Sequence, residues 1–461
     1  MLYGLTSLGR IITIDTKTGA ATVVSTLRPV NGDTDPFVAL NGTNYGIDFD
    51  PVPLASTTLT TERLRVTSDT GENYRVNADT GEAFTQALVS GAAATDIAFT
   101  NSFAAGDTSR VGYFLDANSD TLGVIAVDTG VTSNAVPLNI DFDGVNAFDI
   151  DGRNNAGLAA LNVGGTTSLY TIQMPAVGGQ TANITATAVG AIGSGEVVRG
   201  LAIPTPVPTV HALTGDNRLF TFDARSPSTA TPTPIAGVPE GQTVVGIDVN
   251  PVNGQVYGVT SGGTLVTIDA TTAAATVVAQ LTANPEDTSA PFAALDGTAF
   301  DLDFNPTNGG LRIVSNTGQN LAVDVANGLV TTAPTLNRAD GTPQVTGAAY
   351  SNNYANAVGT NLRVIDTANS TIYQQSLFTG TLSSPVALRN VTATGDVGFD
   401  IAGGQNGLSL GAFNVSGLTS LYRVAFGGGA VTPINEGVAP AATSTIGDGS
   451  IPVRDIAINL K

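Results

Sequence analysis

Short apolar stretches alternate with polar turns along the whole chain. Runs of about five to seven residues, rich in Val, Ile, Thr, Phe and Tyr, recur roughly every 8–14 residues between Gly, Asn, Asp and Pro. Helical periodicity is missing, apart from one turn expected near residues 81–89. Asp-Gly and Asp-Thr-Gly sequences between the runs are typical of hairpin turns. The pattern predicts an all-β protein of antiparallel strands.

The expected strands group in fours. Between residues 244 and 434, four successive groups begin at Val244, Phe300, Val345 and Val397. Each group is a four-stranded antiparallel meander of about 45–55 residues, which is the repeat length of a β-propeller blade. We therefore predict propeller blades.

The chain also contains a long internal near-repeat. YGLTSLGRIITID at residues 3–15 returns as YGVTSGGTLVTID at residues 257–269. NYGIDFDP at residues 44–51 returns as AFDLDFNP at residues 299–306. The matching segments of the two copies stay about 250 residues apart in the later matches as well, which indicates two related units in tandem.

The second copy contains the strands needed to close itself. VRDIAI at residues 453–458 is a lone strand, and residues 211–237 supply three strands that lack a first one. Pairing them makes a fifth blade and leaves no open sheet edge. We predict a first propeller unit at residues 1–203, a Pro-rich linker at 204–209 and a second propeller unit of about five blades at 210–461.

The first copy begins about one blade later than the second, so its closure has three solutions. VRGLAI at residues 198–203 closes it as a unit of about four blades, or an upstream blade completes it. Alternatively, residues 198–203 run on into the second copy, and the chain forms one large nine-bladed propeller. We favour two separate propellers because IPTPVPT at residues 203–209 is typical of an interdomain linker.

At the repeated positions the chain resembles a bacterial family catalogued as domain-of-unknown-function 4394. The matching segments are IDFDP and LDFNP, LRVTSDTGENYRVN and LRIVSNTGQNLAVD, FDI, SLY, and the Asn pairs near Asn101 and Asn352. They cover nearly all of the second copy and most of the first. The chain departs from the family in two ways: Ala322 stands where the first copy has Arg75, and we expect the first copy to lack the family's first blade. The resemblance implies an exported propeller-like protein and brings no catalytic residues, since the family has no established activity.

Composition excludes several classes of function. The net charge is −20 and the only lysines are Lys17 and Lys461, so nucleic-acid binding is disfavoured. The absence of Cys excludes disulfides and Cys-ligated metals. No apolar run approaches about 18 residues, so we expect no membrane span.

Location is inferred from the same composition. The richness in Thr, Asn and Gly favours an extracellular or cell-surface protein. The N-terminus has no basic and then apolar signal-peptide pattern, so we expect that an export signal has been removed or was never part of this chain.

Nucleophilic catalysis finds little support. The chain has one histidine, His211, and GLSLG at residues 407–411 matches the G-x-S-x-G pattern inside an expected strand. That pattern needs a strand–turn–helix elbow, so we interpret the match as coincidence. No Gly-rich phosphate loop precedes a lysine.

Aspartate carboxylates are the only chemically functional side chains that recur in a regular pattern along the sequence. Aspartates recur in the first strand of each group, and such strands line a propeller channel. The positions are Asp48, Asp96, Asp149, Asp248, Asp303, Asp400 and Asp455. Either they bind a hard cation such as Ca²⁺, or they pair with backbone amides and with Arg65, Arg199, Arg312 or Arg454. We favour pairing.

A separate acidic loop predicts a calcium site in the first copy. Its oxygen ligands would come from Asp141, Asp143, Asp149, Asp151 and Asn154. Arg153 departs from the calcium-loop pattern, because it stands where that pattern needs an oxygen. We expect no other cofactor.

These observations favour a non-enzymatic structural or interaction propeller that binds protein partners or self-associates. One alternative is a secreted hydrolase or lyase that uses carboxylates at the channel mouth. The other is a scaffold that Ca²⁺ stabilises.

Overall fold

The computed structural model describes residues 1–51, 64–103, 110–174, 184–288, 290–404, 407–435 and 443–460. These residues form β-strands and one short 3-10 helix, η1 (Pro227–Thr229), so the all-β prediction is confirmed. The helical turn expected near residues 81–89 is wrong, because β8 (Glu82–Thr85) lies there. No helix among the described residues has the length and apolar character needed to cross a membrane.

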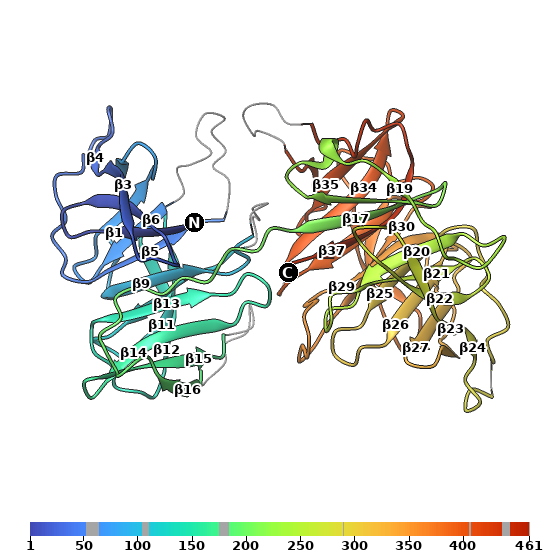
Figure 1. The fold of residues 1–461 in the computed structure, drawn as a ribbon, viewed down its shortest axis with the longest axis horizontal. Helices are drawn as coiled ribbons and strands as arrows, with labels where there is room; N and C mark the ends of the chain where they lie inside the picture. The colour runs from blue at the N-terminus through green and yellow to red at the C-terminus, as the bar shows by residue number, and fades with distance from the viewer. Residues whose placement is uncertain are drawn as a thin grey trace. The chain divides into compact units, whose positions relative to one another are not determined.

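The chain divides into two compact units, Met1–Pro206 and Val207–Lys461 (Figure 1). The division falls within the Pro-rich segment at residues 204–209.

The second unit consists of antiparallel sheets that follow one another along the chain (Figure 1). Their strands are, sheet by sheet, β17 (Thr209–Thr214), β18 (Arg218–Asp223), β19 (Thr233–Pro234) and β37 (Val453–Asn459); β20 (Val244–Val249), β21 (Val256–Thr260), β22 (Thr264–Ile268) and β23 (Ala275–Gln280); β25 (Phe300–Phe304), β26 (Leu311–Ser315), β27 (Asn320–Asp324), β28 (Leu329–Thr332) and the parallel β24 (Thr282–Ala283); β29 (Val345–Tyr350), β30 (Leu362–Asp366), β31 (Thr371–Gln375) and β32 (Leu382–Ala387); and β33 (Gly398–Ala402), β34 (Leu408–Val415), β35 (Leu418–Val424) and β36 (Val431–Pro433). This arrangement is that of propeller blades, as predicted.

The inner strands of these sheets form a closed ring. β20, β25, β29 and β33 contact one another in succession, and β37 contacts both β33 and β20. β37 also pairs antiparallel with β17, from Thr209 opposite Asn459 to Thr214 opposite Val453. Strand 453–458 therefore completes a sheet of its own unit rather than pairing with the N-terminal strand, as a nine-bladed ring would require.

Apolar side chains fill the spaces between neighbouring sheets. Phe304, Ile313 and Leu321 lie on one sheet and pack with Val259 and Leu265 of the preceding sheet. All five side chains are buried, which places the apolar positions of each strand against the next blade.

The first unit contains the same series of sheets but begins differently. Its strands are β1 (Leu2–Leu5), β2 (Arg10–Ile14) and β3 (Ala21–Thr26); β5 (Tyr45–Phe49), β6 (Leu64–Ser68), β7 (Asn73–Val76), β8 and the parallel β4 (Arg28–Pro29); β9 (Ala94–Phe99), β10 (Gly112–Asp116), β11 (Thr121–Ala126) and β12 (Val131–Pro137); and β13 (Asn146–Ile150), β14 (Gly157–Val163), β15 (Thr166–Ile172) and β16 (Ala186–Ala191). The first sheet has three strands, and residues 198–203 form none.

One glycine permits the close approach of two inner strands in this unit. A Cβ on Gly46 of β5 would lie 2.4 Å from Cα of Asp96 and 2.6 Å from the backbone nitrogen of Ile97, both on β9. The equivalent crossing in the second unit has the reverse arrangement, with Asp301 on β25 and Gly347 on β29. Each crossing thus has a glycine on one of its two inner strands and an aspartate on the other.

Candidate functional site

Aspartates on the inner strands connect neighbouring sheets. One carboxylate oxygen of Asp248 accepts a hydrogen bond from the N–H of Val249 (2.6 Å), and the other from the N–H of Phe304 on the next inner strand (2.7 Å). Asp400 accepts in the same way from Ile401 and Ile458, each at 2.5 Å. Each side chain therefore links two inner strands that share no backbone ladder.

The first unit repeats this arrangement. Asp96 accepts from the N–H groups of Ile97 (2.9 Å) and Phe148 (2.5 Å). Asp149 accepts from Ile150 (2.7 Å) and from Ile203 (2.5 Å), just as Asp400 accepts from Ile458. Residues 198–203 thus follow β13 in the way that β37 follows β33, although they form no strand.

The arginines expected to pair with these aspartates have other partners. Arg65 forms ion pairs with Asp50 and Asp128, and Arg454 with Asp396. Arg312 donates to the side-chain oxygen of Asn320 (3.0 Å) and to the hydroxyl of Tyr350 (3.4 Å). In the described contacts, the inner-strand aspartates therefore bind backbone amides. The prediction that they pair with these three arginines is wrong.

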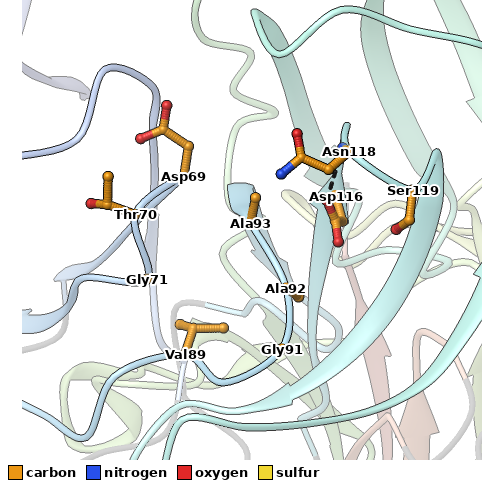
Figure 2. A pocket seen from close by; sticks show the side chains of 10 residues that line it. All are labelled: Asp69, Thr70, Gly71, Val89, Gly91, Ala92, Ala93, Asp116, Asn118 and Ser119. Atoms are coloured by element: carbon orange, nitrogen blue, oxygen red, sulfur yellow. Dashed lines mark hydrogen bonds between the residues drawn. The ribbon is translucent and has the colours of Figure 1, made fainter.

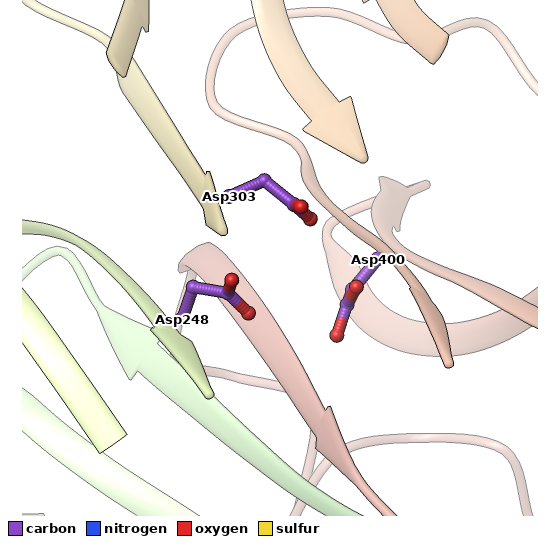
Figure 3. A group of neighbouring side chains, drawn as sticks. All are labelled: Asp248, Asp303 and Asp400. Carbon is purple, nitrogen blue, oxygen red and sulfur yellow. The ribbon is translucent and has the colours of Figure 1, made fainter. Parts of the chain in front are cut away.

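Three of the aspartates meet at the centre of the second unit. Figure 3 shows the carboxylates of Asp248, Asp303 and Asp400 pointing toward one another, and one oxygen from each lies within 4.8 Å of the others. Asp303 is 1% exposed, and neither of its oxygens accepts a well-formed hydrogen bond; the nearby N–H of Tyr350 only offsets part of the rise in its pKa. Asp301, on the same strand, has one such unsatisfied oxygen, and its other oxygen accepts from the N–H of Ala348 (2.8 Å).

Burial makes these charges unfavourable. It raises the pKa of Asp248, Asp303 and Asp455 well above the usual range, and neighbouring carboxylates raise these pKa values further. Burial likewise raises the pKa of Asp400 to about 7. A buried group of carboxylates without a positive partner must take up protons or a cation.

The predicted calcium loop does not gather its ligands into one site. Asp141 and Asp143 are exposed, and Asp149 already accepts from two N–H groups. Asp151 forms an ion pair with Arg153 (2.6 Å), and the side-chain oxygen of Asn154 accepts from the N–H of Ala156 (2.9 Å). Calcium binding by this loop stays a prediction.

The candidate nucleophile and base lie in separate strands. Ser409 of GLSLG is in β34, as expected, and its buried hydroxyl has no hydrogen-bond partner. His211 is in β17, 2% exposed, with Nδ1 3.1 Å from the hydroxyl of Thr221. Burial lowers the pKa of His211 to about 4. This histidine is placed as a neutral core residue.

A pocket of about 440 Å³ opens in the first unit. Figure 2 shows its lining, which comes from the turn at Asp69, the segment before β9 and the turn after β10. The side chain of Asp69 accepts hydrogen bonds from the N–H groups of Thr43 and Asn44, and that of Asp116 from the N–H of Asn118. Its acidic groups thus stabilise turns, which is a structural role.

The edge of the first sheet differs most between the two units. Strand β21 pairs with β20, whereas β1, its equivalent, pairs only with β2 among the described residues. All of β25 is buried, whereas most of β1 and its neighbour β5 is only half-buried.

The hydrogen bonding beside this edge also differs between the two units. The N–H of Phe304 donates to Asp248 of β20, but that of its equivalent, Phe49, donates to Asp48 on its own strand (2.6 Å). The second oxygen of Asp48 accepts from the N–H of Phe99 (3.0 Å). Both oxygens of Asp48 are therefore occupied, whereas neither oxygen of Asp303 accepts a well-formed hydrogen bond.

A family model described as "Domain of unknown function (DUF4394)" matches residues 1–202 and 218–446. No curated protein matches the chain.

Among solved structures, a protein of unknown function from Bacteroides caccae is 11% identical with a TM-score of 0.33, over 54% of this chain and 86% of its own. The computationally designed Ika8 protein is 12% identical with a TM-score of 0.25, over 85% and 97%. A protein from Lactobacillus plantarum is 12% identical with a TM-score of 0.28, over 79% and 98%. Likeness at this level indicates neither a shared site nor a shared ligand.

Proposed function

The chain belongs to the domain-of-unknown-function 4394 family, and we propose that it is a non-enzymatic structural and interaction protein of the extracellular space or cell surface. In this proposal the first unit binds an extended strand of a neighbouring chain at the edge of β1. The observation that carries it is the three-stranded first sheet, whose equivalent in the second unit has a fourth strand.

A free sheet edge is a template for strand addition. It presents backbone N–H and C=O groups in register, and a strand from another chain can satisfy them. Among the described residues, Tyr3, Leu5, Ile47 and Phe49 lie partly buried beside this edge, so an added strand would also cover apolar surface.

The second unit indicates what kind of strand would bind at the edge of β1. β20 reads VVGIDV and places Asp248 opposite Tyr257, the equivalent of Tyr3. An incoming strand of the same alternation would bring a carboxylate within reach of the N–H of Phe49. The proposed partner is therefore an extended, apolar segment with one aspartate opposite Tyr3.

The extracellular location and the lack of enzyme activity rest on other support. Few charges, abundant Thr, Asn and Gly, and no Cys are consistent with an exported protein. Asp248 and Asp400 are used for hydrogen bonds between neighbouring inner strands, and the 1% exposure of Asp400 gives a substrate almost no surface to contact.

One observation favours the alternative of a hydrolase or lyase. Burial, together with Asp151, raises the pKa of Asp149 to about 6, a range suited to general acid–base catalysis. Turnover of a polysaccharide or ester that rises through pH 6 and is lost in Asp149→Asn, with unchanged melting, would support this second candidate.

The test of strand binding uses the full chain and a synthetic peptide of residues 242–251, QTVVGIDVNP. We expect saturable binding at one peptide per chain by fluorescence anisotropy, with slower hydrogen exchange at Tyr3 and Leu5, whose N–H groups point away from β2. The Asp248→Asn peptide should bind more weakly, and a scrambled peptide or one with N-methylated amides should not bind. Equal binding of the scrambled peptide, or no binding at millimolar concentration, contradicts the proposal.

Self-association is a separate readout. If a neighbouring copy supplies the strand, light scattering should detect oligomers at high concentration that the same peptide dissociates. A strict monomer that still binds the peptide would mean that the strand comes from a different protein.

A further inference from the structure

We propose that the centre of the second unit is a binding site for one hard divalent cation, with Asp248, Asp303 and Asp400 as its protein ligands. The site is independent of the strand-binding edge and of the acidic loop at residues 141–154. Nothing in the proposed interaction function requires it.

Geometry provides the first argument. The three carboxylates come from β20, β25 and β33, whose ring of contacts directs them to a common centre. One oxygen of each lies within 4.8 Å of the others, a spacing that one ion can bridge (Figure 3). Ligands on three strands of a closed ring are held rigidly, as a metal site requires.

The unsatisfied side chain of Asp303 provides the second argument. It is 1% exposed, faces the other two carboxylates, and accepts no well-formed hydrogen bond on either oxygen, although the N–H of Tyr350 lies near enough to lower its pKa. A buried carboxylate oxygen without a donor is costly, and a cation at the centre would satisfy it.

Charge balance provides the third argument. The ion pairs found among the described residues of the second unit join other groups, such as Arg338 with Asp366 and Arg454 with Asp396. The three central carboxylates thus have no positive side chain as a partner. One divalent cation would offset most of their charge.

The ligand atoms define the class of metal. All three ligands are carboxylates, which suit Ca²⁺, Mg²⁺ or Mn²⁺ rather than the softer metals bound by sulfur and imidazole. Asp248 and Asp400 each already accept two N–H hydrogen bonds, yet carboxylate oxygens have further lone pairs with which to coordinate.

The first unit contains a matched control. Asp48, the equivalent of Asp303, has both oxygens occupied by the N–H groups of Phe49 and Phe99. Among the described residues of that unit, no group of three carboxylates comes together. We therefore infer one cation per chain.

Because the site is buried, exchange is expected to be slow, and the experiment begins from unfolded protein. The full chain is refolded with calcium, with magnesium, or with chelator, dialysed against metal-free buffer, and analysed for metal content and melting temperature. We expect about one cation per chain and a Tm higher by roughly 5 °C or more when the cation is in large excess over its Kd.

Two variants make the test specific. Asp303→Asn should lower the affinity about 10-fold or more and remove the Tm response, yet melt higher than the wild type in chelator, because it removes a buried charge. Asp48→Asn should retain the metal content and the Tm response of the second unit. Equal Tm with cation and with chelator, or full binding by Asp303→Asn, would overturn the site.

Discussion

The carboxylate of Asp455 accepts a hydrogen bond from the backbone N–H of Ile247, 208 positions earlier in the sequence, at 2.8 Å. This contact joins β37 to β20, the two inner strands that complete the ring of the second unit. The other oxygen of Asp455 accepts from the N–H of Ile456 (2.8 Å). One side chain therefore satisfies two buried donors at the position where the ring closes.

Removal of this side chain should weaken the ring. Asp455→Ala leaves the N–H groups of Ile247 and Ile456 without their acceptor, and we expect a loss of about 2–4 kcal/mol in the free energy of unfolding. Denaturant titration of the full chain measures it. Glu286→Ala, at an exposed position, is the control and should change stability by less than about 0.5 kcal/mol. An equal effect of the two variants would contradict the role assigned to Asp455.

Gly46 should not tolerate a side chain. In Gly46→Ala the new Cβ would lie 2.4 Å from Cα of Asp96, so the two inner strands must separate. We expect a destabilisation of about 3 kcal/mol or more by thermal or chemical unfolding. Gly200→Ala meets no atom within 4 Å and provides the control, which should be nearly neutral.

Asp50 is the centre of a buried ion network in the first unit. It is 3% exposed and accepts from Arg110 at 2.7 Å and from Arg65 at 3.2 Å. Asp50→Asn removes the ion-pair partner of Arg110 and leaves Arg65 with Asp128 alone, and it should cost about 3 kcal/mol. The exposed Arg28–Glu82 pair is the comparison, since Glu82→Gln should cost less than about 1 kcal/mol. Equal losses would mean that burial of the network does not matter.

His211 should make the fold sensitive to acid. Burial lowers its pKa to about 4 in the folded state, against an unfolded value near 6.5, so only the unfolded chain takes up this proton between these values. Its contribution to stability is complete above about pH 6.5 and falls as the pH decreases toward 4, by up to about 3 kcal/mol. The buried aspartates have raised pKa values and act in the opposite direction. The measurement is therefore the stability difference between wild type and His211→Gln, which should depend on pH only in this window.

Ser409 should be dispensable. Its hydroxyl is buried without a partner, so Ser409→Ala should leave stability unchanged or raise it by up to about 1 kcal/mol. Any hydrolase activity found in the wild type should persist in this variant. Selective loss of such activity would make GLSLG a true nucleophile motif.

The repeated pattern of strands could be predicted because alternation and turn residues act locally. GIDV, FDI and VRDI placed Asp248, Asp400 and Asp455 on inner strands, and the structure has them there. Their partners could not be predicted, because the choice between a backbone N–H and an arginine depends on the distance between sheets. That distance is set by packing across the ring.

Comparison of the two copies indicates a contact between inner strands that the alternation of apolar and polar residues does not reveal. The backbone of Asp96 lies against Gly46 in the first unit, and the second unit has Gly347 and Asp301 at the equivalent positions. This reciprocal exchange marks a contact between adjacent blades.

The calcium prediction for the loop at residues 141–154 counted acidic residues, but the guanidinium of Arg153 binds the carboxylate of Asp151.

The pairing of β17 with β37 also determines the order in which the second unit can assemble. β17, β18 and β19 are synthesised first, but the inner strand of their sheet is made last. During synthesis this sheet has an unpaired edge until β37 leaves the ribosome, and the ring cannot close earlier. Pairing over such a sequence separation makes folding slow. The second unit is therefore expected to reach its native state only after its translation is complete.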